Sequence, residues 1–221
     1  MKTTRMCAGA LALLLAAGPH ATAETIRTQY KTNGASGFVL TYGPGASVYL
    51  SVSETESKGP DGSAQARLDF NATSGTWPED FEQIGGGGFI PATAVSSNSD
   101  SIQVDIDDVG SIPGFYLSGY RCSQQICESF TPTAPVAVHL TIKKSRVYTV
   151  HMTGTRRLHA EMVQPAGTTY DETQNGTISY SEATAEGVVA DTAVPIADAV
   201  AASASTSLSR GVIVSVTRTT P

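Results

Sequence analysis

The sequence has little of what most functional classes require. Only 15 % of its 221 residues are charged, and it has one tryptophan and three cysteines. After residue 23 no stretch is apolar over the 18 or more residues that a membrane-spanning helix needs. The most apolar stretch, residues 187–202, is interrupted by Asp191, Pro195 and Asp198. We therefore expect no transmembrane segment after residue 23.

Familiar catalytic motifs are also missing. There is no Gly-x-Ser-x-Gly nucleophile elbow and no His-Glu-x-x-His helix motif. The run of four glycines at 85–88 is followed by Phe89-Ile90-Pro91, not by the Lys and Ser or Thr of a phosphate-binding loop. His159 and Glu161 have the spacing of a zinc deaminase, but the Pro-Cys-x-x-Cys that such enzymes need downstream is absent. Whether the protein is an enzyme stays open, and these absences favour a protein without catalysis.

The first 23 residues have the features of a signal peptide. Lys2 and Arg5 precede an apolar core at residues 8–17, and Ala21-Thr22-Ala23 fits the small-residue pattern before a cleavage site at Glu24. Residues 24–221 would then form the mature chain. We expect this chain to be secreted or periplasmic.

Basic residues are scarce in the mature chain. Removing Lys2 and Arg5 from the 14 basic residues leaves 12 against 20 acidic ones, a net charge of −8. Binding to nucleic acid depends on clustered Lys and Arg that neutralise phosphates. The sequence therefore excludes nucleic acid as the expected partner and leaves an unknown protein or glycan.

Cleavage would also remove Cys7 and leave two cysteines, Cys122 and Cys127. An even number of cysteines in an exported chain favours a disulfide. The alternatives are weaker, because a redox motif has two intervening residues instead of four, and a zinc site needs two further ligands. We predict a structural disulfide that closes a short loop.

Alternation of apolar and polar residues predicts β-strands along most of the chain. The clearest example is residues 102–107, where every second residue is apolar. Turn-forming residues recur about every ten positions, among them Asn33-Gly34 and a polar loop at 165–176 that ends in Asn-Gly. Residues 182–209 show no clear period, and their structure is left open. We predict an all-β fold: a single antiparallel β-sandwich, Ig-like or jelly-roll-like, of roughly nine to twelve short strands.

A hairpin is predicted in the centre of the chain. Residues 136–142 and 147–153 alternate, and residues 143–147 would form the connecting loop. Aligning the apolar faces of the two strands places His139 opposite His151. Two imidazoles on facing strands can bind zinc or another transition metal. The simpler interpretation is two solvent-facing histidines.

An acidic run offers a second candidate metal site. Asp105 and Asp107 share one strand face, and Asp108 begins the following turn. Carboxylate oxygens are the ligands that calcium prefers. The alternative is a solvated acidic rim that discourages pairing between sheet edges. We expect no resident cofactor, with calcium or zinc as the ions that would occupy these sites.

Aromatic residues suggest a ligand platform. Trp77, Tyr116 and Tyr120 could present flat rings to a glycan or peptide, with Phe81 and Phe115 nearby. The alternative places Trp77 and Phe115 in the core of the sandwich. Taken together, the sequence favours an exported non-catalytic binding or surface-interaction module. A metal-dependent hydrolase that uses the histidine pair and a purely structural envelope protein are the alternatives.

Overall fold

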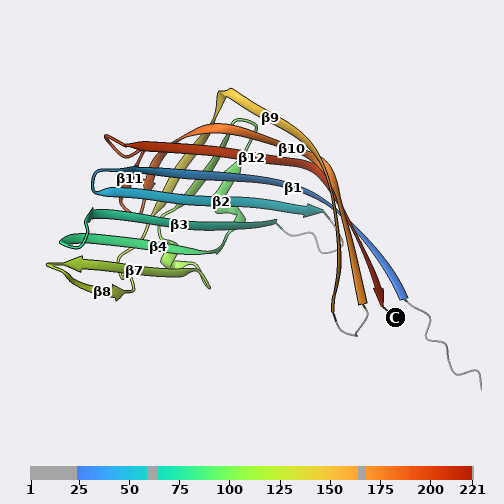
Figure 1. Ribbon diagram of the computed structural model, residues 1–221, viewed down its shortest axis with the longest axis horizontal. Coiled ribbons are helices and arrows are strands. Elements are labelled where there is room, and N and C mark those ends of the chain that lie inside the picture. The colour runs from blue at the N-terminus through green and yellow to red at the C-terminus, as the bar shows by residue number, and fades with distance from the viewer. Residues whose placement is uncertain (1–23, 59–63, 164–167, 221) are drawn as a thin grey trace, which may run out of the picture.

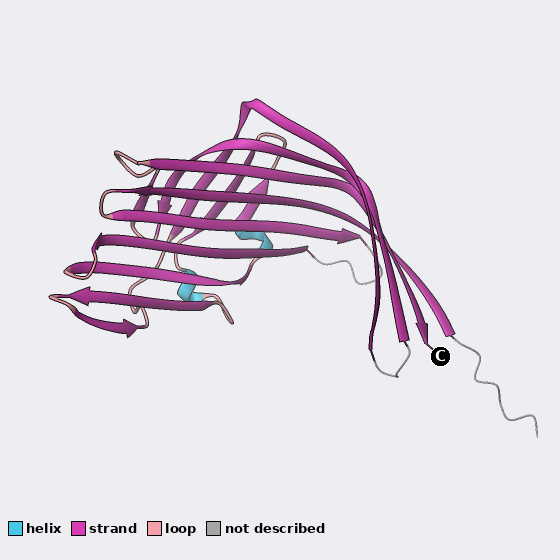
Figure 2. Ribbon diagram, viewed as in Figure 1, coloured by secondary structure: helices cyan, strands magenta, loops and turns pink. Residues whose placement is uncertain are grey.

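The computed structural model describes residues 24–58, 64–163 and 168–220. The predicted signal peptide lies outside these residues. Nearly all of the described chain is β-strand, and two short 3-10 helices connect strands (Figure 2). The elements are β1 (Glu24–Gly43), β2 (Ala46–Lys58), β3 (Ala64–Thr76), β4 (Asp80–Ile90), η1 (Ala92–Ala94), β5 (Val95–Ser97), β6 (Ser101–Ile106), η2 (Val109–Ser111), β7 (Tyr116–Ser123), β8 (Ile126–Phe130), β9 (Val138–Val163), β10 (Thr168–Val189), β11 (Thr192–Val194) and β12 (Ala201–Thr220).

All twelve strands belong to one antiparallel sheet. Its order is β5-β6-β9-β10-β12-β1-β2-β3-β4-β7-β8, and β11 pairs with β10 beside this path. The prediction of an antiparallel all-β fold is confirmed. The two separate sheets of a sandwich are not found among the described residues, because β9, β10 and β12 connect both sides into a single hydrogen-bonded sheet.

The sheet curls so that one part of it lies behind the other. Figure 1 shows β1 to β4 in front, with strands of the β6 and β9 side crossing behind them. The apolar side chains enclosed between the two parts form the core. A Cβ placed on Gly37 of β1 would lie 2.6 Å from Cδ1 of Ile142 and 3.5 Å from Cδ1 of Ile102, which shows how closely the parts approach. Curling thus buries the inner face without a second sheet.

Strand periodicity explains which residues fill this core. On β2, β3, β6 and the first residues of β9 (138–142), every second residue points inward, as the two-residue repeat of a strand requires. The fully buried side chains include Val48, Leu50, Val52, Leu68, Ile102, Val138 and Ile142. Phe115, one of the candidate aromatics, also belongs to the core because its ring stacks on that of Phe70 at 6.3 Å.

Four strands are much longer than the short strands that the sequence predicts. β1, β9, β10 and β12 have 20, 26, 22 and 20 residues. Their outer parts extend beyond the core as a four-stranded layer, visible at the right of Figure 1. We call this layer the arm and define it as residues 24–32, 153–163, 168–175 and 212–220. The remainder of the described chain is called the body.

Glycines from all four strands line up where the arm leaves the body. Gly154 pairs with Gly176, and Gly176 faces the bulge of β12 at Gly211. The neighbouring strand contributes Gly34, and the amide N–H of Gly211 donates to Oδ1 of Asn33 at 2.9 Å. The predicted turns at the two Asn-Gly pairs are therefore wrong. Both pairs lie inside continuous strands, at the bend of the sheet.

The predicted hairpin within residues 136–153 is also wrong. β9 continues from Val138 to Val163, and residues 145–148 form a bulge in it opposite β10. The partners of β9 are β6 and β10, so residues 138–142 and 149–153 pair with these other strands and not with each other. Residues 182–209, left open by the sequence, contain the end of β10, the short β11 and the start of β12.

Candidate functional site

The candidate site begins at the turn between β3 and β4. This turn carries Trp77 and is held against the tip of the β7–β8 hairpin by two backbone hydrogen bonds. The N–H of Gln124 donates to the carbonyl of Glu79 at 2.9 Å, and that of Gln125 donates to the carbonyl of Pro78 at 3.2 Å. Gln124 and Gln125 both have positive φ, 49° and 67°. Positive φ at both central residues is typical of the two-residue hairpin turn whose twist matches the strands.

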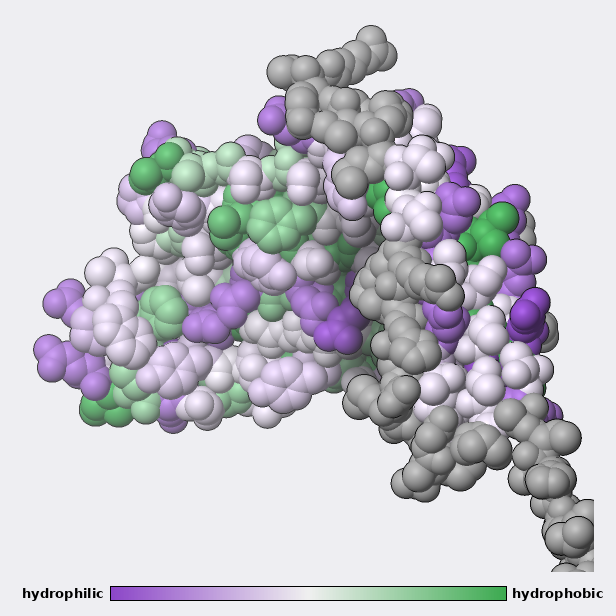
Figure 3. All heavy atoms as spheres, turned by 45° about the vertical axis from the view of Figure 1, so that its right-hand side comes forward, coloured by the Kyte–Doolittle hydropathy of each residue, from purple (hydrophilic) through white to green (hydrophobic). Residues whose placement is uncertain are grey.

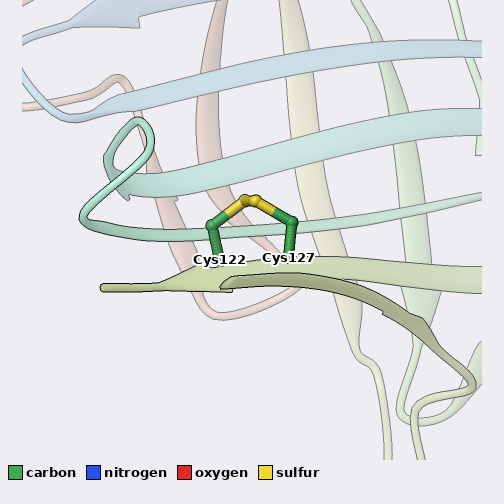
Figure 4. Close-up of a disulfide and its surroundings, with 2 residues drawn as sticks. All are labelled: Cys122 and Cys127. Carbon is green, nitrogen blue, oxygen red and sulfur yellow. A yellow bond between two sulfur atoms is a disulfide. The ribbon is translucent and has the colours of Figure 1, made fainter. Parts of the chain in front are cut away.

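A disulfide closes the same hairpin. Cys122 on β7 and Cys127 on β8 are direct partners in the register, and their Cα atoms lie 4.1 Å apart (Figure 4). Cys122 is 2 % exposed. The predicted disulfide is thus confirmed. It fixes the hairpin to which the Trp77 turn is bound, and so restrains the turn as well.

Three aromatic rings form a cluster beside the Trp77 turn and the β7–β8 hairpin. The Trp77 ring stacks on that of Tyr120 at 5.9 Å and 17°, and it meets the Phe81 ring edge-on at 5.4 Å and 82°. Trp77 is nevertheless 56 % exposed, so it does not belong to the core. We call Trp77, Phe81 and Tyr120 the aromatic cluster. Its geometry is fixed by ring contacts while much of the tryptophan surface faces solvent.

Tyr116 lies on the same strand as Tyr120 and, four residues away, on the same face, because side chains alternate along β7. Its side chain is 68 % exposed. Both tyrosines line an open groove of about 480 Å³ where β8 ends beside β7. The groove is lined by Gln83, Tyr116, Leu117, Ser118, Gly119, Tyr120, Ser129, Phe130 and Thr131. All nine are uncharged, and their polar groups are amides and hydroxyls.

Arginines on β7 and β3 form ion pairs with neighbouring carboxylates. Arg121 donates from Nε to Glu128 at 2.7 Å, and its guanidinium lies 5.1 Å from the centre of the Phe130 ring. On β3, Arg67 pairs with Asp69 at 2.8 Å. The hydrogen bond and the charge of Asp69 raise the pKa of Arg67 above its usual value. On the face of the body that Figure 3 shows, hydrophilic and hydrophobic side chains are intermixed.

A second group of predicted site residues meets at β6 and β9. Asp105 and His139 are register partners, and Nδ1 of His139 lies 2.5 Å from Oδ1 of Asp105. The other ring nitrogen, Nε2, lies 3.4 Å from Oδ1 of Asp107. Each nitrogen therefore faces a different carboxylate, and the three side chains do not converge on one point. Within 24–58, 64–163 and 168–220, no group of three or more His, Cys, Asp or Glu side chains is arranged to hold a metal ion.

The remaining predicted metal ligands lie apart from this group. Oδ1 of Asp108 accepts hydrogen bonds from the N–H groups of Gly110 at 2.9 Å and Val136 at 3.2 Å, so its carboxylate caps η2. His139 pairs with Val188 and His151 with Ser179, nine residues along β10. At about 3.3 Å per residue this separates the two histidines by roughly 30 Å. The side chain of His151 is outside the described part of the structure.

Sequence reasoning named Trp77, Tyr116 and Tyr120 but missed the polar side of the groove. Gln83, Ser118, Ser129 and Thr131 come from three parts of the chain and carry no motif. Only the pairing of β4 with β7 and of β7 with β8 brings them together. Isolated polar residues on strands give no sequence signal that distinguishes a groove from ordinary surface.

Comparisons with protein-family models, with curated proteins and with solved structures each found no match. No helix within the described residues has the length and apolar character needed to cross a membrane.

Proposed function

We propose that the chain is an exported, non-catalytic binding module and that the groove beside the aromatic cluster binds a neutral carbohydrate. The observation that carries this proposal is the exposure of Trp77, at 56 %, in a fixed stack with Tyr120. A large ring that remains in water despite two aromatic neighbours offers a flat apolar surface to a ligand. Tryptophan and tyrosine rings suit such contacts because they combine an apolar face with a polar edge.

The lining of the groove supports a neutral, hydroxyl-rich ligand. Ser118, Ser129 and Thr131 supply hydroxyls that both donate and accept, and Gln83 supplies an amide with the same versatility. The groove contains no charged residue to compensate an ionic ligand. Its volume of about 480 Å³ is within the range of sites for small ligands. Sugar rings present apolar faces and a rim of hydroxyls, which match both sets of groups.

The rigidity of the β7–β8 hairpin and the Trp77 turn favours binding as well. The disulfide Cys122–Cys127 and the two hydrogen bonds from the hairpin tip hold the Trp77 turn before any ligand arrives. Pre-organised groups lose less conformational entropy on binding. The disulfide is in keeping with an oxidising compartment, and with the predicted signal peptide it supports export.

The test uses the purified exported protein and a panel of neutral oligosaccharides: cello-, xylo-, malto- and chito-hexaoses. Because Trp77 is the sole tryptophan, its fluorescence reports directly on the cluster. We expect at least one class of oligosaccharide to change the Trp77 emission and to give a saturable heat signal in calorimetry. Acidic oligosaccharides of similar length serve as the charged comparison and should bind more weakly.

Substitutions connect the binding to the groove. A stacked aromatic contact contributes about 0.5–1.5 kcal/mol. Tyr116→Ala and Tyr120→Ala should therefore each weaken the calorimetric affinity by about two- to tenfold. Tyr180→Ala is the matched control, because Tyr180 on β10 is a 43 % exposed tyrosine outside the groove. No binding by any neutral oligosaccharide, or equal effects of all three substitutions, would contradict the proposal and favour a purely structural envelope protein.

A further inference from the structure

The glycine run of β4, residues 85–88, contributes to both faces of the sheet. Gly86 faces the core, where a Cβ would lie 2.8 Å from Cε1 of Phe115. Gly85 and Gly87 face the other side, because side chains alternate along a strand. Close packing in the core therefore explains Gly86, but the two outer glycines need a reason on the outer face.

Two polar side chains from β3 lie over these outer glycines. Asp69 is the register partner of Gly87, and Asn71 is the partner of Gly85. A Cβ on Gly87 would overlap Oδ1 of Asp69, and a Cβ on Gly85 would lie 3.2 Å from Nδ2 of Asn71. The tips of both side chains thus reach from β3 across β4. Glycine at these two positions gives them the space.

Arg67 fixes the carboxylate of Asp69 in this position. Nε of Arg67 donates to Oδ2 at 2.8 Å, and its Nη2 donates to Oδ1 at 3.0 Å. An ionised carboxylate has about four lone-pair sites, so this bidentate pair leaves acceptor capacity on both oxygens. The side chain of Asp69 is 38 % exposed, and a ligand can therefore reach it.

The same two glycines connect these polar tips to the groove. On the other side of β4, Gly87 pairs with Tyr116 and Gly85 pairs with Ser118, and both partners line the groove. Register partners share a face of the sheet, and the tips that lie over β4 are one strand spacing, roughly 5 Å, from β7. Figure 1 shows β3, β4 and β7 side by side in the body. At these two positions β4 places no side chain between the tips and the groove.

Building on the proposed carbohydrate binding, on which this step rests, we propose that the ligand extends from the groove over Gly85 and Gly87. Asp69 and Asn71 are then specificity-determining residues that form hydrogen bonds with its hydroxyl groups. The carboxylate accepts from hydroxyls, and the amide both donates and accepts. Asp69 also neutralises Arg67, so the pair offers no unpaired cation to an acidic sugar. The site therefore selects neutral over acidic oligosaccharides.

The first test measures the affinity for the neutral hexaoses and for acidic oligosaccharides of similar length by calorimetry. Asp69→Ala should weaken binding of the neutral hexaose by about tenfold, a typical loss for a hydrogen bond to a charged group. The same variant should bind acidic oligosaccharides about two- to fivefold more tightly, because Arg67 becomes an unpaired cation. A residue with a merely structural role would not move the two affinities in opposite directions.

Two further variants separate hydrogen bonding from charge. Asn71→Ala removes an amide without changing the charge, so it should weaken binding of neutral and acidic oligosaccharides alike, by about two- to tenfold. Glu182→Ala is the matched control for Asp69→Ala. Glu182 is an exposed carboxylate on β10, and β12, β1 and β2 lie between that strand and β3. Glu182→Ala should leave both affinities unchanged.

The second test moves Asp69 without removing it. Gly87→Ala places a methyl group where Oδ1 of Asp69 lies, and this oxygen is the end of a side chain that can turn away. We expect Gly87→Ala to weaken binding of the neutral hexaose as Asp69→Ala does, and to leave the near-ultraviolet circular dichroism unchanged. In the Asp69→Ala background the same glycine substitution should have no further effect, because the two changes act through one carboxylate.

Three results would overturn the proposal. If Tyr116→Ala weakens binding of the neutral hexaose while Asp69→Ala and Asn71→Ala do not, the ligand stays within the groove and the proposed function stands without this extension. If the wild-type protein binds no neutral oligosaccharide, the extension fails together with the proposed function. If Gly87→Ala weakens binding equally with and without the Asp69 carboxylate, the glycine does not act by making room for it.

Discussion

Gly154 of β9 and Gly176 of β10 are direct partners at the bend of the sheet, but only one of them is sterically essential. A Cβ on Gly176 would lie 2.6 Å from the Cα of Val212, a backbone atom that cannot move aside easily. A Cβ on Gly154 would meet nothing closer than Cδ1 of Ile178 at 3.9 Å. The two glycines therefore have different roles despite their symmetrical places in the register.

This difference predicts unequal effects of the same substitution. Gly176→Ala should lower the free energy of unfolding by about 1–3 kcal/mol, as overpacking does. Gly154→Ala should change it by less than about 1 kcal/mol and should tend to stabilise, because alanine restricts the unfolded chain. Urea denaturation of both variants checks the prediction. Equal destabilisation by the two alanines would contradict it.

The disulfide should contribute modestly to the free energy of unfolding of the whole protein. Its main effect should be to restrain the β7–β8 hairpin and, through it, the Trp77 turn. Cys122 and Cys127 are separated by five positions, and a loop this short gives about 2 kcal/mol in the chain-entropy model. We expect the Cys122→Ser/Cys127→Ser double variant to lose about that amount in urea denaturation, and its Trp77 emission to change. An unchanged Trp77 spectrum would show that the hairpin does not restrain the Trp77 turn.

The hairpin tip offers a stabilising substitution. Gln125 has a φ of 67°, and this left-handed conformation costs a residue with a Cβ roughly 1 kcal/mol relative to glycine. Gln125→Gly should therefore raise the free energy of unfolding by about 1 kcal/mol. Gln125→Ala is the control and should give no gain, because alanine retains the Cβ. Thermal denaturation of the three proteins separates these outcomes.

Lys144 should make stability depend on pH in the alkaline range. Burial lowers the pKa of Lys144 below its usual 10.5, and the charge of Asp100 partly opposes this shift. Between the lowered pKa and 10.5 the unfolded chain binds more protons than the folded one, so the free energy of unfolding rises with pH there. Below that window the folded protein carries an unfavourably buried charge.

Replacing this lysine should remove the effect. We expect Lys144→Gln to have a slightly higher Tm than wild type at neutral pH, and the difference to shrink as the pH approaches 10.5. The difference should be small because Lys144 is only partly buried. Calorimetric melts of both proteins at several pH values provide the comparison. A difference that widens with pH would have the wrong sign for this mechanism.

The acidic residues around His139 provide a test of the metal hypothesis. An ion that binds only the folded state raises stability, by about 2.7 kcal/mol when its concentration is 100 times Kd. We expect no rise in Tm when calcium or zinc is added to chelator-treated protein, because the two nitrogens of His139 face Asp105 and Asp107 separately. A rise that His139→Ala abolishes would reverse this expectation and favour the metal-dependent hydrolase.

The sequence by itself determined the local features. The alternation at residues 102–106 is a property of one strand and needs no partner to be recognised, and β6 occupies Ser101–Ile106. Cys122 and Cys127 lie close enough in the chain that their pairing followed from spacing and number alone. In each case the information lies within a few residues, because strand periodicity and short loop closure are local.

Only the tertiary structure decided how the strands pair. Asn175-Gly176 is a favoured turn sequence, but here the glycine is needed because Val212 of a distant strand approaches too closely for a side chain. His139 was placed opposite His151 by local symmetry, yet its actual neighbour Asp105 lies 34 residues earlier in the chain. Alternation fixes which side chains share a face, but it is the same for any partner strand. The partner is chosen by burial of the whole inner face, which no single segment encodes.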